Sequence, residues 1–295
     1  MQPVRPAGRE SSKGAFVAVA FEQKVAIIQF PGVNCEYETA RALESVGMSA
    51  SILRWNLAPA MIPGFDGFVL PGGFSYQDRV RAGAVAASDD VMETLIAAAG
   101  EGKPILGICN GAQVLVESGL VPGFTGGKID LALAPNKGMG RGGYYSNWVY
   151  LRVGPEPGRS FVTCSLEEAD LLPVPIAHCQ GRFTSSEAGL FDKMEAANQL
   201  VLKYCRADGS APGGFPDDPN GSERSAAAIC NTAGNVVAMM PHPERSTWLR
   251  QVPADIDSAW ARKRNAGLAS WAALEGEGPG AGIFRSMKSY IEERM

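Results

Sequence analysis

A cysteine between two glycines carries the clearest chemical signal of this sequence. The segment 107–111 reads Gly-Ile-Cys-Asn-Gly; it follows an apolar run that predicts a strand over 104–108 and precedes helical spacing over 111–118. Small flanking residues permit the tight turn that lifts a side chain above the edge of a sheet, and a helix N-terminus favours a reactive thiolate. Cys109 is therefore a predicted nucleophile, although a merely buried cysteine in a close-packed turn would fit the same pattern.

The chain has two histidines, so a thiol that needs an imidazole as its base has two possible partners, His178 and His242. His242 lies in Pro-His-Pro-Glu-Arg, two positions before Glu244. In extended backbone, positions i and i+2 face the same side, so we expect Glu244 to orient the imidazole of His242. The flanking prolines cannot donate to a sheet, which predicts a loop at a strand end. The alternative is a solvated turn in which Glu244 pairs with Arg245.

Attack on an amide also needs donors for the oxyanion that develops. Pro-Gly-Gly at 71–73 follows a predicted strand over 67–70, and glycines at a strand end expose backbone amides. We expect the amides of Gly73 and Asn110 to form the oxyanion hole. A plain strand-ending turn is the other interpretation of this segment.

Strands and helices alternate in the first half of the chain. Apolar runs at 24–30, 67–70 and 104–108 are followed by helical spacing at 36–46, 88–99 and 111–118, and shorter β-like segments follow from residue 147. This order predicts an α/β fold with a mostly parallel sheet and helices on both faces. In such sheets the functional site lies at the carboxyl ends of the strands.

The pattern divides the chain into four parts. Residues 1–23 form a polar N-terminal extension in which 16–21 could make an edge strand, and 24–247 form the main domain. Residues 248–282 have the proline, glycine and charge content of a linker or insertion. In 283–295, Phe284, Met287 and Ile291 share one helical face, which predicts a C-terminal helix packed on the domain.

Composition excludes several classes of protein. The net charge is −4 and no long run of lysine or arginine occurs, which disfavours nucleic acid as a partner. The apolar stretches are too short to span a bilayer and no signal peptide is evident, so we expect no membrane association and a cytoplasmic location. The six cysteines show no Cys-x-x-Cys spacing, which disfavours a zinc site or a disulfide scaffold, and no metal site is expected.

Taken together, these motifs resemble the triad (class I) glutamine amidotransferases, and among them the small glutaminase subunit of phosphoribosylformylglycinamidine synthase. The resemblance covers about 24–247 and the final helix, and it implies a flavodoxin-like fold. Further segments in the same order carry it: 30–36 (FPGVNCE), 70–76 (LPGGFSY), 81–83 (RAG), 175–178 (PIAH), 218–222 (DPNGS) and 234–236 (GNV). The sequence departs from the family pattern at Gln77, Arg79 and Gln180.

The resemblance implies hydrolysis of glutamine by a Cys109, His242 and Glu244 triad in purine biosynthesis. Gln113 would lie near the bound glutamine, and His178 would be either a structural residue or part of the glutamine site. Ammonia would pass to a separate large synthetase subunit, joined by a small bridging subunit. The sequence has no Gly-x-x-x-x-Gly-Lys-Ser/Thr loop, so this chain needs no cofactor of its own, and ATP and magnesium would belong to the synthetase.

Three other functions share parts of this pattern. The chain could serve another synthetase, such as those that make cytidine triphosphate, guanylate or anthranilate. It could be a noncatalytic regulatory subunit with a relic triad, or a cysteine hydrolase or peptidase with the same turn. The segments 30–35 and 218–222 argue against the first, and the intact Cys109, His242 and Glu244 argue against the second.

Overall fold

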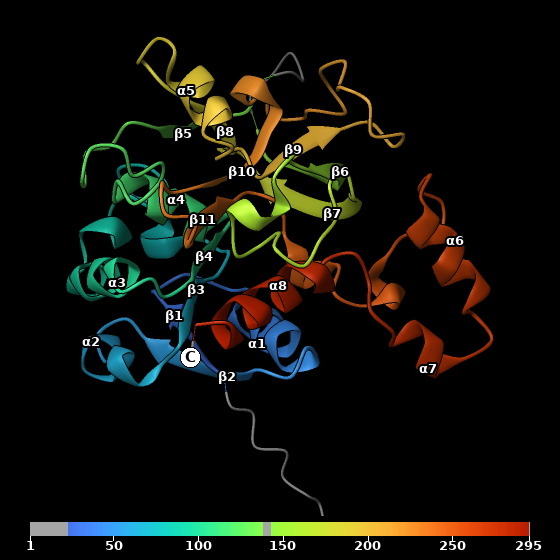
Figure 1. The fold of residues 1–295 in the computed structure, drawn as a ribbon, viewed down its shortest axis with the longest axis horizontal. Helices are drawn as coiled ribbons and strands as arrows, with labels where there is room; N and C mark the ends of the chain where they lie inside the picture. Colours follow the sequence, from blue (N-terminus) through green and yellow to red (C-terminus); the bar gives the residue numbers. More distant parts are fainter. Residues whose placement is uncertain (1–22, 138–142, 295) are drawn as a thin grey trace, which may run out of the picture.

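A nine-stranded sheet forms the centre of the protein (Figure 1). The computed structural model describes residues 23–137 and 143–294. The strand order is β2-β1-β3-β4-β11-β10-β9-β6-β7. The first five strands in this order are mutually parallel, and the remaining four continue the sheet by antiparallel pairing. Their bounds are β1 Lys24–Gln29, β2 Ser49–Arg54, β3 Gly67–Leu70, β4 Ile105–Ile108, β6 Tyr145–Val153, β7 Leu171–His178, β9 Leu202–Cys205, β10 Ala226–Cys230 and β11 Val236–Met239.

Helices cover the parallel half of the sheet. In Figure 1, α3 lies on one side of these strands, and α1 and α8 lie on the other, where they contact each other. The helix α4 begins directly after β4 and packs against β3, β4 and β11. The bounds of the helices are α1 Glu36–Ser45, α2 Ala58–Met61, α3 Asp90–Gly100, α4 Asn110–Glu117, α5 Leu190–Ala196, α6 Ala259–Ala266, α7 Trp271–Leu274 and α8 Ala281–Glu292. A small two-stranded sheet joins β5 Ala132–Ala134 to β8 Arg182–Thr184.

The predicted α/β fold is confirmed. Every residue of β3, β4 and β11 is buried, as near-continuous apolar strands require when both faces of a parallel sheet are covered. Sequence reasoning missed β2, which pairs with β1 at the edge of the sheet. Two serines interrupt its apolar pattern, and an edge strand needs less apolar surface than a central one.

The topology brings five chemically important segments to one edge of the sheet. Parallel strands have their carboxyl ends together, so the residues after β1, β3, β4 and β11 meet there. Four antiparallel steps separate β7 from β11, so β7 runs in the same direction and His178 ends it at the same edge. The backbone amide of His242 donates to Pro175 O in β7 at 2.8 Å, and this hydrogen bond joins the segment after β11 to β7.

The C-terminal part of the chain contains more helix than its sequence predicts. The stretch 248–282 holds α6 and α7, which project from the body in Figure 1, and Trp260 Nε1 donates to Leu171 O at 3.3 Å. In α8, Phe284 and Met287 are fully buried. The edge strand expected over 16–21 lies outside the described residues. Within the described ranges, no helix has the length and apolar character needed to cross a membrane.

Candidate active site

Cys109 occupies a strained turn between β4 and α4. Its φ of 51° and ψ of −103° are unusual for a residue other than glycine, and such strain is common in catalytic turns. The amide of Cys109 donates to Met239 O at 2.7 Å, which ties the turn to β11. A side chain at Gly111 would place its Cβ 1.9 Å from Leu70 O, so only glycine permits this approach of α4 to β3. The glycine-flanked motif therefore builds the turn that presents the thiol.

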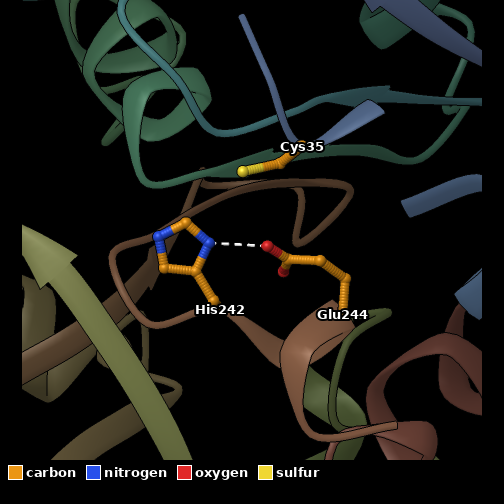
Figure 2. Close-up of side chains that lie close together, drawn as sticks. All are labelled: Cys35, His242 and Glu244. Carbon is orange, nitrogen blue, oxygen red and sulfur yellow. Dashed lines mark hydrogen bonds and ion pairs between the residues drawn. The ribbon is translucent and has the colours of Figure 1, made fainter. Parts of the chain in front are cut away.

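His242 and Glu244 form a buried hydrogen-bonded pair. His242 Nδ1 lies 2.6 Å from Glu244 Oε1, and the side chains are 2% and 0% exposed (Figure 2). The solvated turn considered above is therefore excluded. The two side chains meet because Pro243–Arg245 forms a 3-10 turn, whereas the sequence predicted extended backbone. This correction follows from the prolines, which end the strand and favour a tight turn.

The environment of His242 favours its protonated form. Burial lowers the pKa of an imidazole, but here the negative charge of Glu244 and the nearby sulfur of Cys109 outweigh it, and the pKa of His242 lies well above its ordinary value. The other ring nitrogen, Nε2, is buried without a hydrogen-bond partner among the described residues, and Cys109 Sγ lies 3.6 Å from Ala177 O. A base between a thiol and a buried carboxylate can accept a proton from one while the other stabilises the resulting charge.

The two expected oxyanion donors lie at the same edge of the sheet. Asn110 is the first residue of α4, so its amide has no acceptor within the helix. No acceptor for the Gly73 amide is found within 23–137 and 143–294. A side chain at Gly73, whose φ is 148°, would place its Cβ 2.4 Å from Val33 Cα. Glycine is thus required here by the close approach of the β1 and β3 loops.

The side chains of Asn110 and Gln113 belong to one internal network. Asn110 Oδ1 accepts from the Ser75 amide at 2.9 Å, and Asn110 Nδ2 donates to Gln113 Oε1 at 2.9 Å. Gln113 Nε2 donates in turn to Gln180 O at 2.8 Å. Gln113 therefore connects α4 to the loop after β7, and both ends of its amide are engaged within the protein. Its expected contact with glutamine stays a prediction.

His178 is buried and neutral. Desolvation and the nearby charge of His242 lower the pKa of His178 to about 3. Its Nδ1 lies 3.2 Å from Asn136 Oδ1, which also accepts from the Gly181 amide at 3.1 Å. An imidazole that stays neutral over the working pH range is unsuited to carry charge, so these contacts favour a structural role at the end of β7.

Replacement of His178 by glutamine is expected to remove one source of acid instability. The unfolded chain binds a proton near pH 6.5, whereas the folded protein excludes it until about pH 3, so the wild type loses stability as the pH falls below 6.5. The loss amounts to about 1.4 kcal/mol per pH unit. Denaturant unfolding at pH 7.5 and 5.0 should show a smaller drop for His178→Gln, by about 2 kcal/mol. Equal drops in the two proteins would contradict the buried neutral state.

Two residues at the site were not identified as functional from the sequence. Asn136 is buried and also donates through Nδ2 to His178 O at 2.9 Å, but nothing close in sequence relates it to His178. Cys35 follows β1 in a segment used above only for its resemblance to a family. Its sulfur, a His242 ring nitrogen and a Glu244 carboxylate oxygen all lie within 4.8 Å of one another. Cys35 could have been recognised from the sequence because it follows a predicted parallel strand, and functional residues of such sheets lie at the carboxyl ends of the strands.

Comparisons with known proteins identify the family of this chain. Residues 22–291 match the family model of the CobB/CobQ-like glutamine amidotransferase domain. The protein named phosphoribosylformylglycinamidine synthase subunit PurQ from Methanothrix thermoacetophila is 44% identical over 277 residues, which cover 92% of this chain and 99% of the relative. The protein of the same name from Saccharolobus solfataricus is 36% identical over 250 residues, covering 84% and 100%.

A solved structure gives the same assignment. A chain in the structure of PurLQS from Thermotoga maritima is similar over 91% of this chain and 98% of that chain, with a TM-score of 0.66 and 29% identity. The glutaminase domain of CTPS from Trypanosoma brucei, at 13% identity and a TM-score of 0.51, covers 92% of this chain and shares the fold. The chain belongs to the CobB/CobQ-like glutamine amidotransferases and, within them, to the PurQ family of glutaminase subunits of phosphoribosylformylglycinamidine synthase.

Proposed function

We propose that this chain hydrolyses glutamine with Cys109 as nucleophile and His242 as proton carrier. Glu244 would orient the imidazole of His242 and stabilise its positive charge. The observation that carries the proposal is the buried contact of 2.6 Å between His242 Nδ1 and Glu244 Oε1, because it directs the other ring nitrogen away from the carboxylate. The strained turn at Cys109 supplies the thiol that this nitrogen would serve. No metal or cofactor is needed for these steps.

The reaction would proceed in two halves. With the proton of Cys109 already held on His242, the sulfur attacks the side-chain carbonyl carbon of glutamine, and the resulting oxyanion accepts hydrogen bonds from the amides of Gly73 and Asn110. His242 then returns the proton to the leaving nitrogen, so ammonia departs and a glutamyl thioester remains on Cys109. Water, deprotonated by His242, attacks the thioester and releases glutamate. Gln113 and His178 would support the pocket through the networks described above.

The ammonia would pass to a synthetase that converts formylglycinamide ribonucleotide into formylglycinamidine ribonucleotide. The similarity to a chain of PurLQS supports a complex with a large synthetase subunit, and we extend this to a small bridging subunit. ATP and magnesium would bind to the synthetase. Residues 24–247, completed by α8, would form the amidotransferase domain, with 248–282 as an insertion that carries α6 and α7.

Covalent labelling tests the proposed nucleophile. A glutamine analogue with an electrophilic carbon in place of the side-chain amide should add once to the protein, and peptide mass spectrometry should place the adduct on Cys109. The variant Cys109→Ser should take up no label. Cys35 and Cys179 provide internal controls, since their thiols are near the site but are not presented by the strained turn. Labelling of either one in preference to Cys109 would contradict the assignment.

A further inference from the structure

A second cysteine lies beside the His242 and Glu244 pair. Cys35 precedes α1, is 1% exposed, and directs its sulfur toward the imidazole and carboxylate (Figure 2). A side chain added at Gly72 would place its Cβ 3.1 Å from Cys35 Sγ and 2.8 Å from His242 Cε1. The sulfur and the imidazole therefore pack against the same point of the loop after β3. The reaction proposed above gives Cys35 no role.

Arg245 links this sulfur to the carboxylate. Arg245 Nη2 donates to Cys35 Sγ at 3.0 Å, and Arg245 Nε lies 3.7 Å from Glu244 Oε1. The guanidinium thus bridges a residue after β1 and a residue after β11, two strands that are not neighbours in the sheet. Since guanidinium groups present donors in a fixed planar arrangement, fixing one end of Arg245 also fixes its position against Glu244.

A metal site is the competing interpretation of a cysteine, a histidine and a glutamate at these separations. The contacts disfavour it. His242 Nδ1 and Glu244 Oε1 already form a hydrogen bond with each other at 2.6 Å. A metal would also have to displace the Arg245 guanidinium that contacts the sulfur of Cys35. A positive group at 3.0 Å from the sulfur would also repel a cation. The arrangement is better suited to hold a hydrogen-bonded pair in place.

We propose that Cys35 is a positioning residue for glutamine hydrolysis: its sulfur anchors Arg245 beside Glu244, and this anchor holds the Glu244 carboxylate in line with His242 Nδ1. The inference rests on the proposed roles of His242 and Glu244. Cys35 does not attack the substrate. Loss of the anchor would leave glutamine binding intact and would slow the proton transfers, because small displacements of a catalytic base are costly to the rate.

Two replacements of Cys35 separate positioning from packing. Cys35→Ala removes the acceptor for Arg245, and we expect kcat for glutamine-dependent synthesis by the assembled complex to fall about tenfold or more, with the KM for glutamine within about twofold. Cys35→Ser keeps an oxygen that can accept from Arg245 and should recover most of the lost kcat. Cys230→Ala is the matched control, since Cys230 is fully buried in β10, outside this cluster, and should leave kcat unchanged.

A double-mutant cycle with Arg245→Met gives the decisive readout. If Cys35 acts through Arg245, the double variant should be no slower than Arg245→Met alone. Wild-type kcat in Cys35→Ala, equal losses in the alanine and serine variants, or additive losses in the cycle would each overturn the inference. Labelling of Cys109 by the electrophilic analogue tests the proposed nucleophile separately. A failure of the Cys109 assignment can therefore be distinguished from a failure of the positioning role of Cys35.

Discussion

Cys109→Ala is expected to abolish glutamine-dependent formation of formylglycinamidine ribonucleotide by the complex, while ammonia-dependent formation continues at the wild-type rate. The thiol is the proposed attacking group, so without it no thioester forms and no ammonia is released from glutamine. Free ammonia reaches the synthetase without this step. Product formation with each nitrogen donor should be measured on the same preparation of the complex.

The control for this experiment is Cys164→Ala. Cys164 packs near α8, where its sulfur contacts Ser286 O at 3.2 Å, and it has no proposed part in the reaction. It should support synthesis from both donors. Loss of ammonia-dependent synthesis in Cys109→Ala would mean that Cys109 is needed for folding or assembly, and the assignment of a nucleophile would fail.

Glu244→Gln is expected to reduce kcat for glutamine hydrolysis by about 10³-fold to 10⁴-fold. The amide has the same shape as the carboxylate but carries no charge, so the pKa of His242 should fall and the imidazolium needed by the leaving nitrogen is no longer stabilised. The amide can also hold the imidazole in the wrong tautomer. Steady-state glutamate release by the assembled complex gives the measurement.

Glu275→Gln is the matched control, because Glu275 pairs with Arg250 at the surface and such pairs contribute little. Its kcat should stay within about twofold of the wild type. A Glu244→Gln enzyme that kept more than about one tenth of the wild-type kcat would show that the buried carboxylate is structural.

The parts of the fold that sequence reasoning identified depend on local signals. The buried strands before Gly72 and Cys109 are short apolar runs; Pro71 and Gly72 follow the first, and the turn at Cys109 follows the second. The pairing of Glu244 with His242 was also expected, because the two lie close together in the sequence. The 3-10 turn at Pro243–Arg245 was not expected, because an extended segment and a tight turn both allow a contact between residues two positions apart.

The contacts that sequence reasoning missed are long-range. Asn136 reaches His178 across 42 positions, and Arg245 reaches Cys35 across 210. No periodicity relates such residues, and only the strand order brings them together. The family resemblance placed Cys35 in a motif but gave it no role. The positioning role proposed for Cys35 comes from the distances to its neighbours.

The most direct test of the proposed activity is glutamate release from glutamine by the purified chain, alone and with the large and bridging synthetase subunits, ATP and formylglycinamide ribonucleotide. We expect release to rise sharply in the complete mixture and to match product formation, with Cys109→Ala inactive in both settings. No release in either setting from a folded chain with its triad intact would contradict the proposed activity, and would indicate that the chain is a noncatalytic member of the complex.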